Sequence, residues 1–203
     1  MEIKKIGSSI YEINNFLNQQ EYLELEKLIN EEAHFYDSIK PDALKVSIYP
    51  FSLKSTPIFY NSAIYILGKK FDIVGKLLEK ILHQDITLNK YWNINRIQEG
   101  GFISKHRDGE CSTQVVFYMN VSKNSHWWNL VFHWDNGDEI LQISPIGNKA
   151  IIFPWNTKHS VTTFTWPERI SFVMGFTVNS EIEEKENYFE MSCNSTISWA
   201  YKS

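Results

Sequence analysis

The stretch GGFISKHRDGE, residues 100–110, places a histidine two positions before an aspartate, shortly after a pair of glycines. Residues i and i+2 of a β-strand point to the same face of a sheet, so His106 and Asp108 can converge on one metal ion. Two ligands hold a metal weakly, and a third must come from elsewhere in the chain. The stretch therefore gains meaning only if the rest of the sequence supplies a sheet and a third ligand.

The length and composition of the chain predict one compact domain. The chain has 203 residues, of which 43% are hydrophobic and 15% aromatic, and its net charge is −4. No block of Lys or Arg stands out, which argues against a protein that grips nucleic acid through its phosphates. The N-terminus lacks the apolar region of a signal peptide, and no apolar run approaches the length of a membrane span. We expect a single cytoplasmic domain over 1–203, with neither nucleic acid nor a membrane as a partner.

The pattern of elements changes at about residue 90. Apolar periodicity predicts helices over 18–35 and about 61–83, with Gly68 as a candidate break in the second. Short β-rich runs follow, separated by turn signals, and such regular spacing favours an antiparallel sandwich or barrel. The predicted strands cover 91–98, 113–121, 129–134, 139–144, 149–155, 159–166 and 169–178. We expect a helical part over about 1–88, a jelly-roll core over about 89–178 and a C-terminal extension over about 179–203.

A third ligand is available late in the predicted sheet. His159 starts a strand directly after IIFPWNTK, residues 151–158, and in a sandwich this unit can fold back beside the strand that carries His106. His106, Asp108 and His159 would then form a facial triad of two histidines and one carboxylate. Such a triad leaves open positions for a co-substrate and O₂ on a non-haem Fe(II) ion.

A candidate anchor for an acidic co-substrate follows ten residues later. Arg169 and Ser171 share one face of a predicted strand with apolar flanks. A guanidinium with a hydroxyl beside it suits a carboxylate, because the planar fork makes two charge-assisted hydrogen bonds. A bound acid is one candidate partner for Arg169, and an ion pair with Glu168 or Asp135 is the other.

Four motifs in this order, GGFISKHRD, VVFYMN, GNKAIIFPWNTKHSV and ERISF, resemble the Fe(II)- and 2-oxoglutarate-dependent oxygenases, and the prolyl 4-hydroxylase-like branch in particular. The opening YEINNFLNQQEYLELEKLINE, residues 11–31, resembles the strand and helix with which that branch begins. The resemblance spans most of residues 10–178. It implies a mainly β fold, a double-stranded β-helix (jelly roll) with N-terminal helices buttressing one sheet.

The resemblance also implies roles for particular residues. The metal ligands would be His106, Asp108 and His159. The co-substrate 2-oxoglutarate would be held by Arg169, Ser171 and Tyr118. Together with Fe(II) and O₂, these residues imply a dioxygenase that hydroxylates its substrate and releases succinate and CO₂. Because Asp108 is present, the resemblance points away from the family's halogenases, which carry a small residue at that place.

The substrate side departs from the family pattern. Trp127 and Trp128 stand where a glycine pair is usual, and their bulk predicts contacts with substrate at a pocket mouth. Asn93 and Asn95 share a strand face, which either lines the cavity or points to solvent. We expect a small-molecule, amino-acid or peptide-like substrate.

Two alternatives remain open at the level of sequence. Within the same class, the substrate is a prolyl side chain of a protein. From a different class comes a cupin-like metal-binding jelly roll that acts as a Zn(II) hydrolase or a non-catalytic binder. The pair Arg169 and Ser171 favours the oxygenase, because hydrolysis needs no anchor for a dicarboxylate.

Overall fold

The computed structural model describes residues 2–7, 9–33, 36–37, 43–50, 57–82, 86–108, 113–119, 129–144, 146–154, 156–165 and 167–178. Within these ranges the chain forms the strands β1 (Glu2–Lys5), β2 (Tyr11–Asn14), β3 (Tyr36–Asp37), β4 (Ala43–Pro50), β5 (Ile86–His106), β6 (Thr113–Tyr118), β7 (Leu130–His133), β8 (Glu139–Ile143), β9 (Lys149–Pro154), β10 (Lys158–Val161) and β11 (Glu168–Val178), and the helices α1 (Gln19–Glu32) and α2 (Pro57–Leu82). The mainly β fold predicted from the sequence is confirmed.

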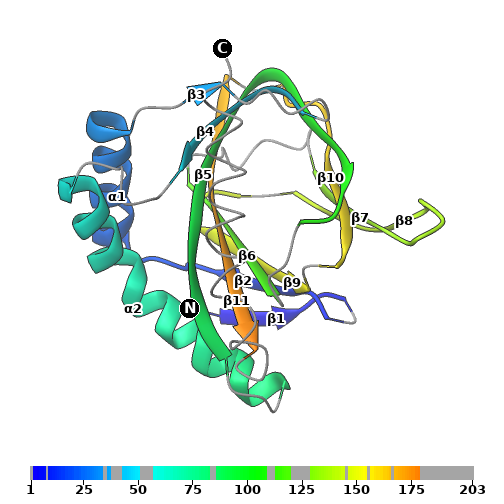
Figure 1. Cartoon of the computed structure of the whole chain (residues 1–203), viewed down its shortest axis with the longest axis horizontal. Coiled ribbons are helices and arrows are strands. Elements are labelled where there is room, and N and C mark those ends of the chain that lie inside the picture. The colour runs from blue at the N-terminus through cyan, green and yellow to red at the C-terminus, as the bar shows by residue number, and fades with distance from the viewer. Residues whose placement is uncertain are drawn as a thin grey trace, which may run out of the picture.

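The strands form one antiparallel sheet that curls on itself into a jelly roll (Figure 1). Their order is β1-β2-β9-β6-β11-β5-β10-β7-β8, and β4 pairs with both β3 and β5. Both helices lie on one side of this sheet (Figure 1), as the sequence predicts. The curl leaves an inner face, which the strands enclose, and an outer face, which the helices cover.

Strand β5 lies between β11 and β10 in the sheet and pairs with each along a different part of its length. Its residues 86–98 pair with β11, whereas Ile103 and His106 pair with β10. The glycine pair lies between these two parts, and Gly100 has a φ of 78°. Phe164 fastens the bend, since its carbonyl oxygen accepts from Gly100 N at 2.6 Å and its N–H donates to Gly101 O at 2.7 Å. The glycines therefore turn the strand without ending it.

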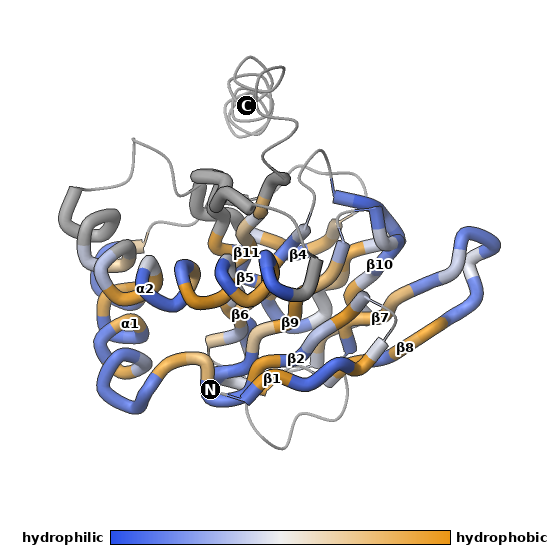
Figure 2. The backbone as a smooth tube through the Cα atoms, turned by 90° about the horizontal axis from the view of Figure 1, so that it is seen from below, coloured by the Kyte–Doolittle hydropathy of each residue, from blue (hydrophilic) through white to orange (hydrophobic). Residues whose placement is uncertain are grey.

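Two apolar clusters separate the faces of the sheet. Along β6, Val115 and Phe117 belong to the outer cluster, which α1 and α2 complete, while Val116 and Tyr118 belong to the inner cluster. The strict alternation follows from the two-residue period of a strand. In Figure 2 the hydrophobic colour follows these central strands, whereas the tip of the β7–β8 hairpin is hydrophilic.

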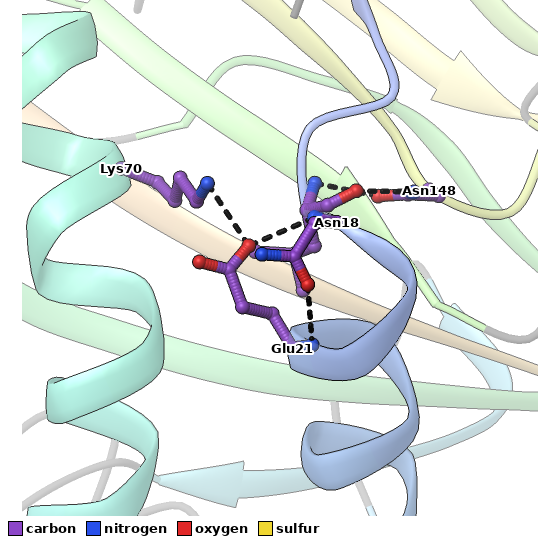
Figure 3. Close-up of polar contacts among 5 residues, drawn as sticks. Asn18, Glu21, Lys70 and Asn148 are labelled. Carbon is purple, nitrogen blue, oxygen red and sulfur yellow. Dashed lines mark hydrogen bonds and ion pairs between the residues drawn. The ribbon is translucent and has the colours of Figure 1, made fainter.

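The helices are fixed to the sheet by a polar network (Figure 3). Asn18 and Glu21 form a capping box that starts α1, and Lys70 of α2 lies 2.9 Å from the Glu21 carboxylate. At the start of β9, the Asn148 side chain accepts from Leu17 N at 2.7 Å and donates to Leu17 O at 2.8 Å. Both ends of this network are satisfied, so the helices cannot slide along the sheet without breaking hydrogen bonds.

Several element boundaries differ from the sequence prediction. Helix α2 continues through Gly68, because the packing of its apolar face outweighs the roughly 1 kcal/mol that a helical glycine costs. Strands β1 to β4 lie in the part expected to be helical, where β2 matches the strand implied by the resemblance. Strand β10 ends at Val161, five residues before the predicted end. None of the described helices combines the length and apolar character that crossing a bilayer requires.

The bend in β5 makes Gly101 intolerant of a side chain. A Cβ there would lie 2.7 Å from Ile97 Cγ2, 2.8 Å from Gln98 O and 2.9 Å from Leu44 O. We expect Gly101→Ala to lower the free energy of unfolding by about 1–3 kcal/mol, as overpacking does elsewhere. Urea unfolding followed by circular dichroism measures the change.

The matched control is Gly75→Ala in α2. A Cβ at Gly75 meets Phe176 Cε1 at 3.6 Å, an ordinary contact, and alanine is the better helix former by about 0.8–1 kcal/mol. We expect this variant to be as stable as the wild type or more stable. Equal stability of the two variants would contradict the role given to Gly101.

Candidate metal centre

The curled sheet brings the three predicted ligands together. His106 ends β5, His159 lies on β10, and the two are direct cross-strand neighbours. Asp108 follows β5 by two residues. Its Oδ1 lies 3.4 Å from His106 Nε2 and its Oδ2 lies 3.2 Å from His159 Nε2. One ligand atom from each residue lies within 4.8 Å of the others, which is the spacing of donors around one metal ion.

Hydrogen bonds turn both imidazoles toward the same point. His106 Nδ1 lies 2.8 Å from Ser104 O, and His159 Nδ1 lies 2.9 Å from Thr157 O. A carbonyl oxygen only accepts, so each Nδ1 carries a proton, and each ring in its neutral form would present the lone pair of its Nε2. With both rings neutral, two lone pairs and a carboxylate would face one another. A cation between them is the arrangement that relieves their mutual repulsion, and the residues therefore fit a divalent metal.

The residues around the candidate metal centre favour the ionised form of Asp108 and place aromatic rings beside His159. Burial alone would raise the pKa of Asp108, but hydrogen bonds and charge from His106 and His159 hold it well below its usual range. The His159 ring is buried and packs edge-on against Phe153, with 4.9 Å between ring centroids. Phe132 in turn packs against Phe153 at 5.1 Å. The carboxylate is thus available as an anionic ligand beside an apolar wall.

The turn between β7 and β8 contacts the strand that carries His106 through Lys105 and Arg107, and we call these contacts the hairpin clamp. Lys105 Nζ donates to Gly137 O at 2.9 Å, and Arg107 forms an ion pair with Asp135. Gly137 and Asp135 belong to the turn between β7 and β8, which is closed by a hydrogen bond from Gly137 N to Trp134 O at 2.9 Å. The two cations alternate with the metal ligands along the chain, so the ligands are fixed from the outer side of the strand.

A second polar group lies deeper on the inner face. Ser171 of β11 is the direct cross-strand neighbour of Tyr118 on β6 and of Asn95 on β5. Directly opposed residues share a face, and Arg169 lies two residues before Ser171 on the same face. Its guanidinium lies over the Tyr118 ring, 4.9 Å from the centroid. The predicted co-substrate residues are therefore neighbours in space.

The three side chains of this group are deeply buried. Arg169 is 3% exposed, and Tyr118 and Ser171 are fully buried. Burial lowers the pKa of Arg169, because the charged form has lost its water. Within the described residues, Ser171 Oγ has no hydrogen-bond partner. A carboxylate bound here would offset the desolvation of the guanidinium and satisfy the hydroxyl.

The two protein carboxylates considered as partners of Arg169 have other contacts. Asp135 pairs with Arg107, and Glu168 lies 3.9 Å from Arg96.

The structure describes only some of the predicted substrate residues. Asn95 is partly buried on the inner face opposite Ser171, which favours the cavity over solvent. Asn93 lies opposite Val173 on the same face, but its side chain is outside the described residues, as are Trp127 and Trp128 altogether.

The sequence prediction overlooked Gln114. It is 5% exposed and shares the strand face of Val116 and Tyr118, so the alternation in TQVVFY was the signal that could have found it.

Comparison with solved structures identifies proteins that share this fold. No protein-family model matches the sequence, and no curated protein matches it. Among solved structures, a prolyl hydroxylase from Trichoplax adhaerens in complex with a peptide fragment of hypoxia inducible factor superposes with a TM-score of 0.67, at 16% identity over 87% of this chain and 86% of that chain. A 2OG-Fe(II) oxygenase family oxidoreductase from Burkholderia pseudomallei superposes with a TM-score of 0.66, at 14% identity over 83% and 84%.

The fold is that of the 2-oxoglutarate- and Fe(II)-dependent oxygenases. HygX from Streptomyces hygroscopicus, solved with nickel, 2-oxoglutarate and hygromycin B, shares this oxygenase fold with a TM-score of 0.59, at 8% identity over 84% of this chain and 83% of that chain. At such identities the likeness establishes architecture alone. The chemistry must be argued from the residues that this chain places on the oxygenase fold.

The hairpin clamp makes a testable contribution to the metal centre. We expect Asp135→Ala to weaken Co(II) binding by about threefold to tenfold, since the pair is exposed yet orients two ligands at once. Titration calorimetry on the metal-free protein measures the affinity.

The control is the charge exchange Arg107→Asp with Asp135→Arg. It recreates the ion pair in reverse and should restore most of the affinity. Unchanged Co(II) affinity in Asp135→Ala would show that the ligands hold their positions without the hairpin.

Proposed function

We propose that the protein is a non-haem Fe(II)- and 2-oxoglutarate-dependent dioxygenase that hydroxylates its substrate with release of succinate and CO₂. One observation carries the proposal. The donor set of His106, Asp108 and His159 opens onto the same inner face that buries Arg169. A metal centre with a buried cationic anchor behind it suits a reaction that consumes a dicarboxylate.

The triad residues would hold the iron through two Nε2 atoms and one carboxylate. Three protein ligands leave coordination positions open. Bound there, Fe(II) supplies the activation of O₂ for attack on a C–H bond, with electrons from the decarboxylation of 2-oxoglutarate. The hydrogen bonds of His106 and His159 from Nδ1 to backbone carbonyls would orient both rings so that Nε2 is the atom that binds the metal.

Arg169 would bind the far carboxylate of 2-oxoglutarate. Its fork matches a carboxylate in two parallel hydrogen bonds, and the Tyr118 ring below it limits where the guanidinium can move. Ser171 adds a hydroxyl from the same face. These residues would orient the co-substrate along the inner face, and the Phe153 ring covers the His159 side of the metal centre.

The substrate is a small molecule or a peptide-like compound. A peptide fragment occupies the Trichoplax structure, and hygromycin B occupies the HygX structure. The oxygenase fold thus accommodates both kinds of substrate, and we assign Asn95, which lies opposite Ser171 on the inner face, to contact with the substrate.

Removal of a ligand tests the metal centre. We expect His106→Ala and His159→Ala each to abolish succinate formation from Fe(II), 2-oxoglutarate and ascorbate, because two remaining ligands hold the metal weakly. The unfolding midpoint should stay close to that of the wild type, since the cavity is built by the sheet. Succinate is quantified by mass spectrometry and metal content by plasma emission.

A folded variant that still forms succinate at the wild-type rate would remove its histidine from the triad. Metal binding by the wild type without any succinate would favour the Zn(II) hydrolase or binder instead.

Arg169 allows a sharper test. Truncating one partner of a buried charge pair costs about 2–5 kcal/mol, so Arg169→Ala should weaken 2-oxoglutarate binding by roughly thirty- to several-thousand-fold. Arg169→Lys should recover part of this, because an ammonium cannot reproduce the fork. Anaerobic titration of the metal-loaded protein gives the affinity, and metal affinity itself should not change.

Arg96→Ala is the matched control. Arg96 lies on β5 with its side chain partly exposed and 3.9 Å from Glu168, so its loss should leave 2-oxoglutarate affinity intact. If Arg169→Ala and Arg96→Ala bind 2-oxoglutarate equally well, the anchor is not Arg169.

A further inference from the structure

Strand β10, which carries His159, is paired differently by its two neighbours. Against β7 the register is regular from Lys158, opposite His133, to Val161, opposite Leu130. Against β5 the register shifts between His159 and Val161, so this ladder is irregular directly beside the candidate ligand. Such an irregularity bends a strand and leaves part of it unpaired. The backbone position of His159 is therefore set mainly from the β7 side.

Strand β7 contacts β10 on both of its faces at this point. Phe132 lies directly opposite His159 and belongs to the inner cluster, and the two ring centroids are 6.3 Å apart. The next residue, His133, points to the opposite face, because successive side chains of a strand alternate. There His133 Nε2 lies 2.8 Å from Oγ of Ser160, the residue that follows His159. One strand thus holds β10 by a ring contact on the inner face and by a hydrogen bond on the other.

The hydrogen bond between His133 and Ser160 is shielded from water on the histidine side. His133 is 4% exposed, and Val131, two residues earlier on the same face of β7, is 1% exposed. Ser160 is partly buried. Loss of either partner would leave a buried polar group without its hydrogen bond, which costs more than the net worth of the bond itself. The contact is therefore suited to fixing the position of β10.

Burial also favours the neutral form of the His133 ring. It lowers the pKa of His133, since the charged form loses its hydration, and the positive charge of Lys105 lowers this pKa further. A neutral imidazole has one N–H and one lone pair, and a hydroxyl complements either of them at Nε2. His133 thus holds Ser160 without adding a positive charge behind a centre that binds a cation.

We propose that His133 is a positioning residue of the metal centre, which acts through Ser160 to fix β10 and thereby the direction of His159 Nε2. The inference rests on the proposed function, because it assigns His133 to the same metal centre. The hydrogen bond of His159 Nδ1 to Thr157 O orients the ring, and His133 fixes the backbone that carries this ring. Together with the hairpin clamp at His106, β7 and its hairpin then orient both histidine ligands.

The first test measures Co(II) binding to the metal-free protein by titration calorimetry. Ser160→Ala removes the hydroxyl, and we expect it to weaken Co(II) binding by about threefold to tenfold, the range for the loss of one hydrogen bond. Ser160→Thr keeps the hydroxyl and should bind Co(II) as the wild type does. The visible absorption of bound Co(II) should change in Ser160→Ala and not in Ser160→Thr, because the ligand geometry changes only when β10 shifts.

Thr162→Val is the matched control. Thr162 Oγ1 accepts from Asn129 N at 2.8 Å, so this variant removes a hydrogen bond between the same two chain segments, beyond the end of β10. We expect Thr162→Val and Ser160→Ala both to lower the urea midpoint, but only Ser160→Ala to change Co(II) affinity. Wild-type Co(II) affinity in Ser160→Ala, or equal losses of affinity in the two variants, overturns the positioning role.

The second test is a double-mutant cycle in Co(II) affinity. His133→Phe keeps a ring and removes the nitrogen atoms, and His133→Gln, whose amide reaches the place of Nε2, should retain part of the affinity that His133→Phe loses. If both residues act through one hydrogen bond, His133→Phe combined with Ser160→Ala should lose no more affinity than the weaker-binding single variant. Additive losses overturn the shared bond, and the Ser160 variants decide the question should His133→Phe not fold.

Failure of the proposed function gives a different result. A wild-type protein that binds no Co(II) contradicts the metal centre, and the positioning role of His133 falls with it. Tight Co(II) binding by the wild type that is unchanged in Ser160→Ala overturns the positioning role alone and leaves the proposed function intact.

Discussion

The bend at Gly100 and Gly101 is the constraint on which the rest of the structure depends. A single strand, β5, pairs with β11 before the bend and with β10 after it. The first pairing places the strand beside the row of Arg169 and Ser171, and the second brings His106 to His159. The bend is tight, because Gly101 has no room for a Cβ. The path of the β5 backbone through this bend therefore sets the distance between Arg169 and the candidate metal centre.

The inner face of the sheet carries groups of opposite charge preference at two places. At one end, two imidazole lone pairs and the carboxylate of Asp108 converge and need a cation. At the other end, the buried guanidinium of Arg169 has lost its hydration, and a bound carboxylate would compensate for that loss. A metal ion with a dicarboxylate spanning the space between satisfies both ends at once. Among the described residues of this face, Val116, Ile151 and Phe153 belong to the inner apolar cluster.

The candidate site could be proposed from the sequence, because alternate residues of a strand share a face. The pairs His106 with Asp108 and Arg169 with Ser171 follow from spacings of two, and their roles stay predictions. The continuity of β5 was missed, since a glycine pair reads as a turn and only the hydrogen bonds to Phe164 keep the strand paired. Gln114 was missed because one polar residue in an apolar run attracts no attention until the fold gives it neighbours.

The most direct measurement is an anaerobic titration of the metal-free protein, first with Fe(II) and then with 2-oxoglutarate, followed by visible absorption. We expect a weak charge-transfer band that appears only when both are present and saturates as 2-oxoglutarate binds. Tight Fe(II) binding with no band and no 2-oxoglutarate affinity would contradict it, and would leave a metal-binding jelly roll with another chemistry.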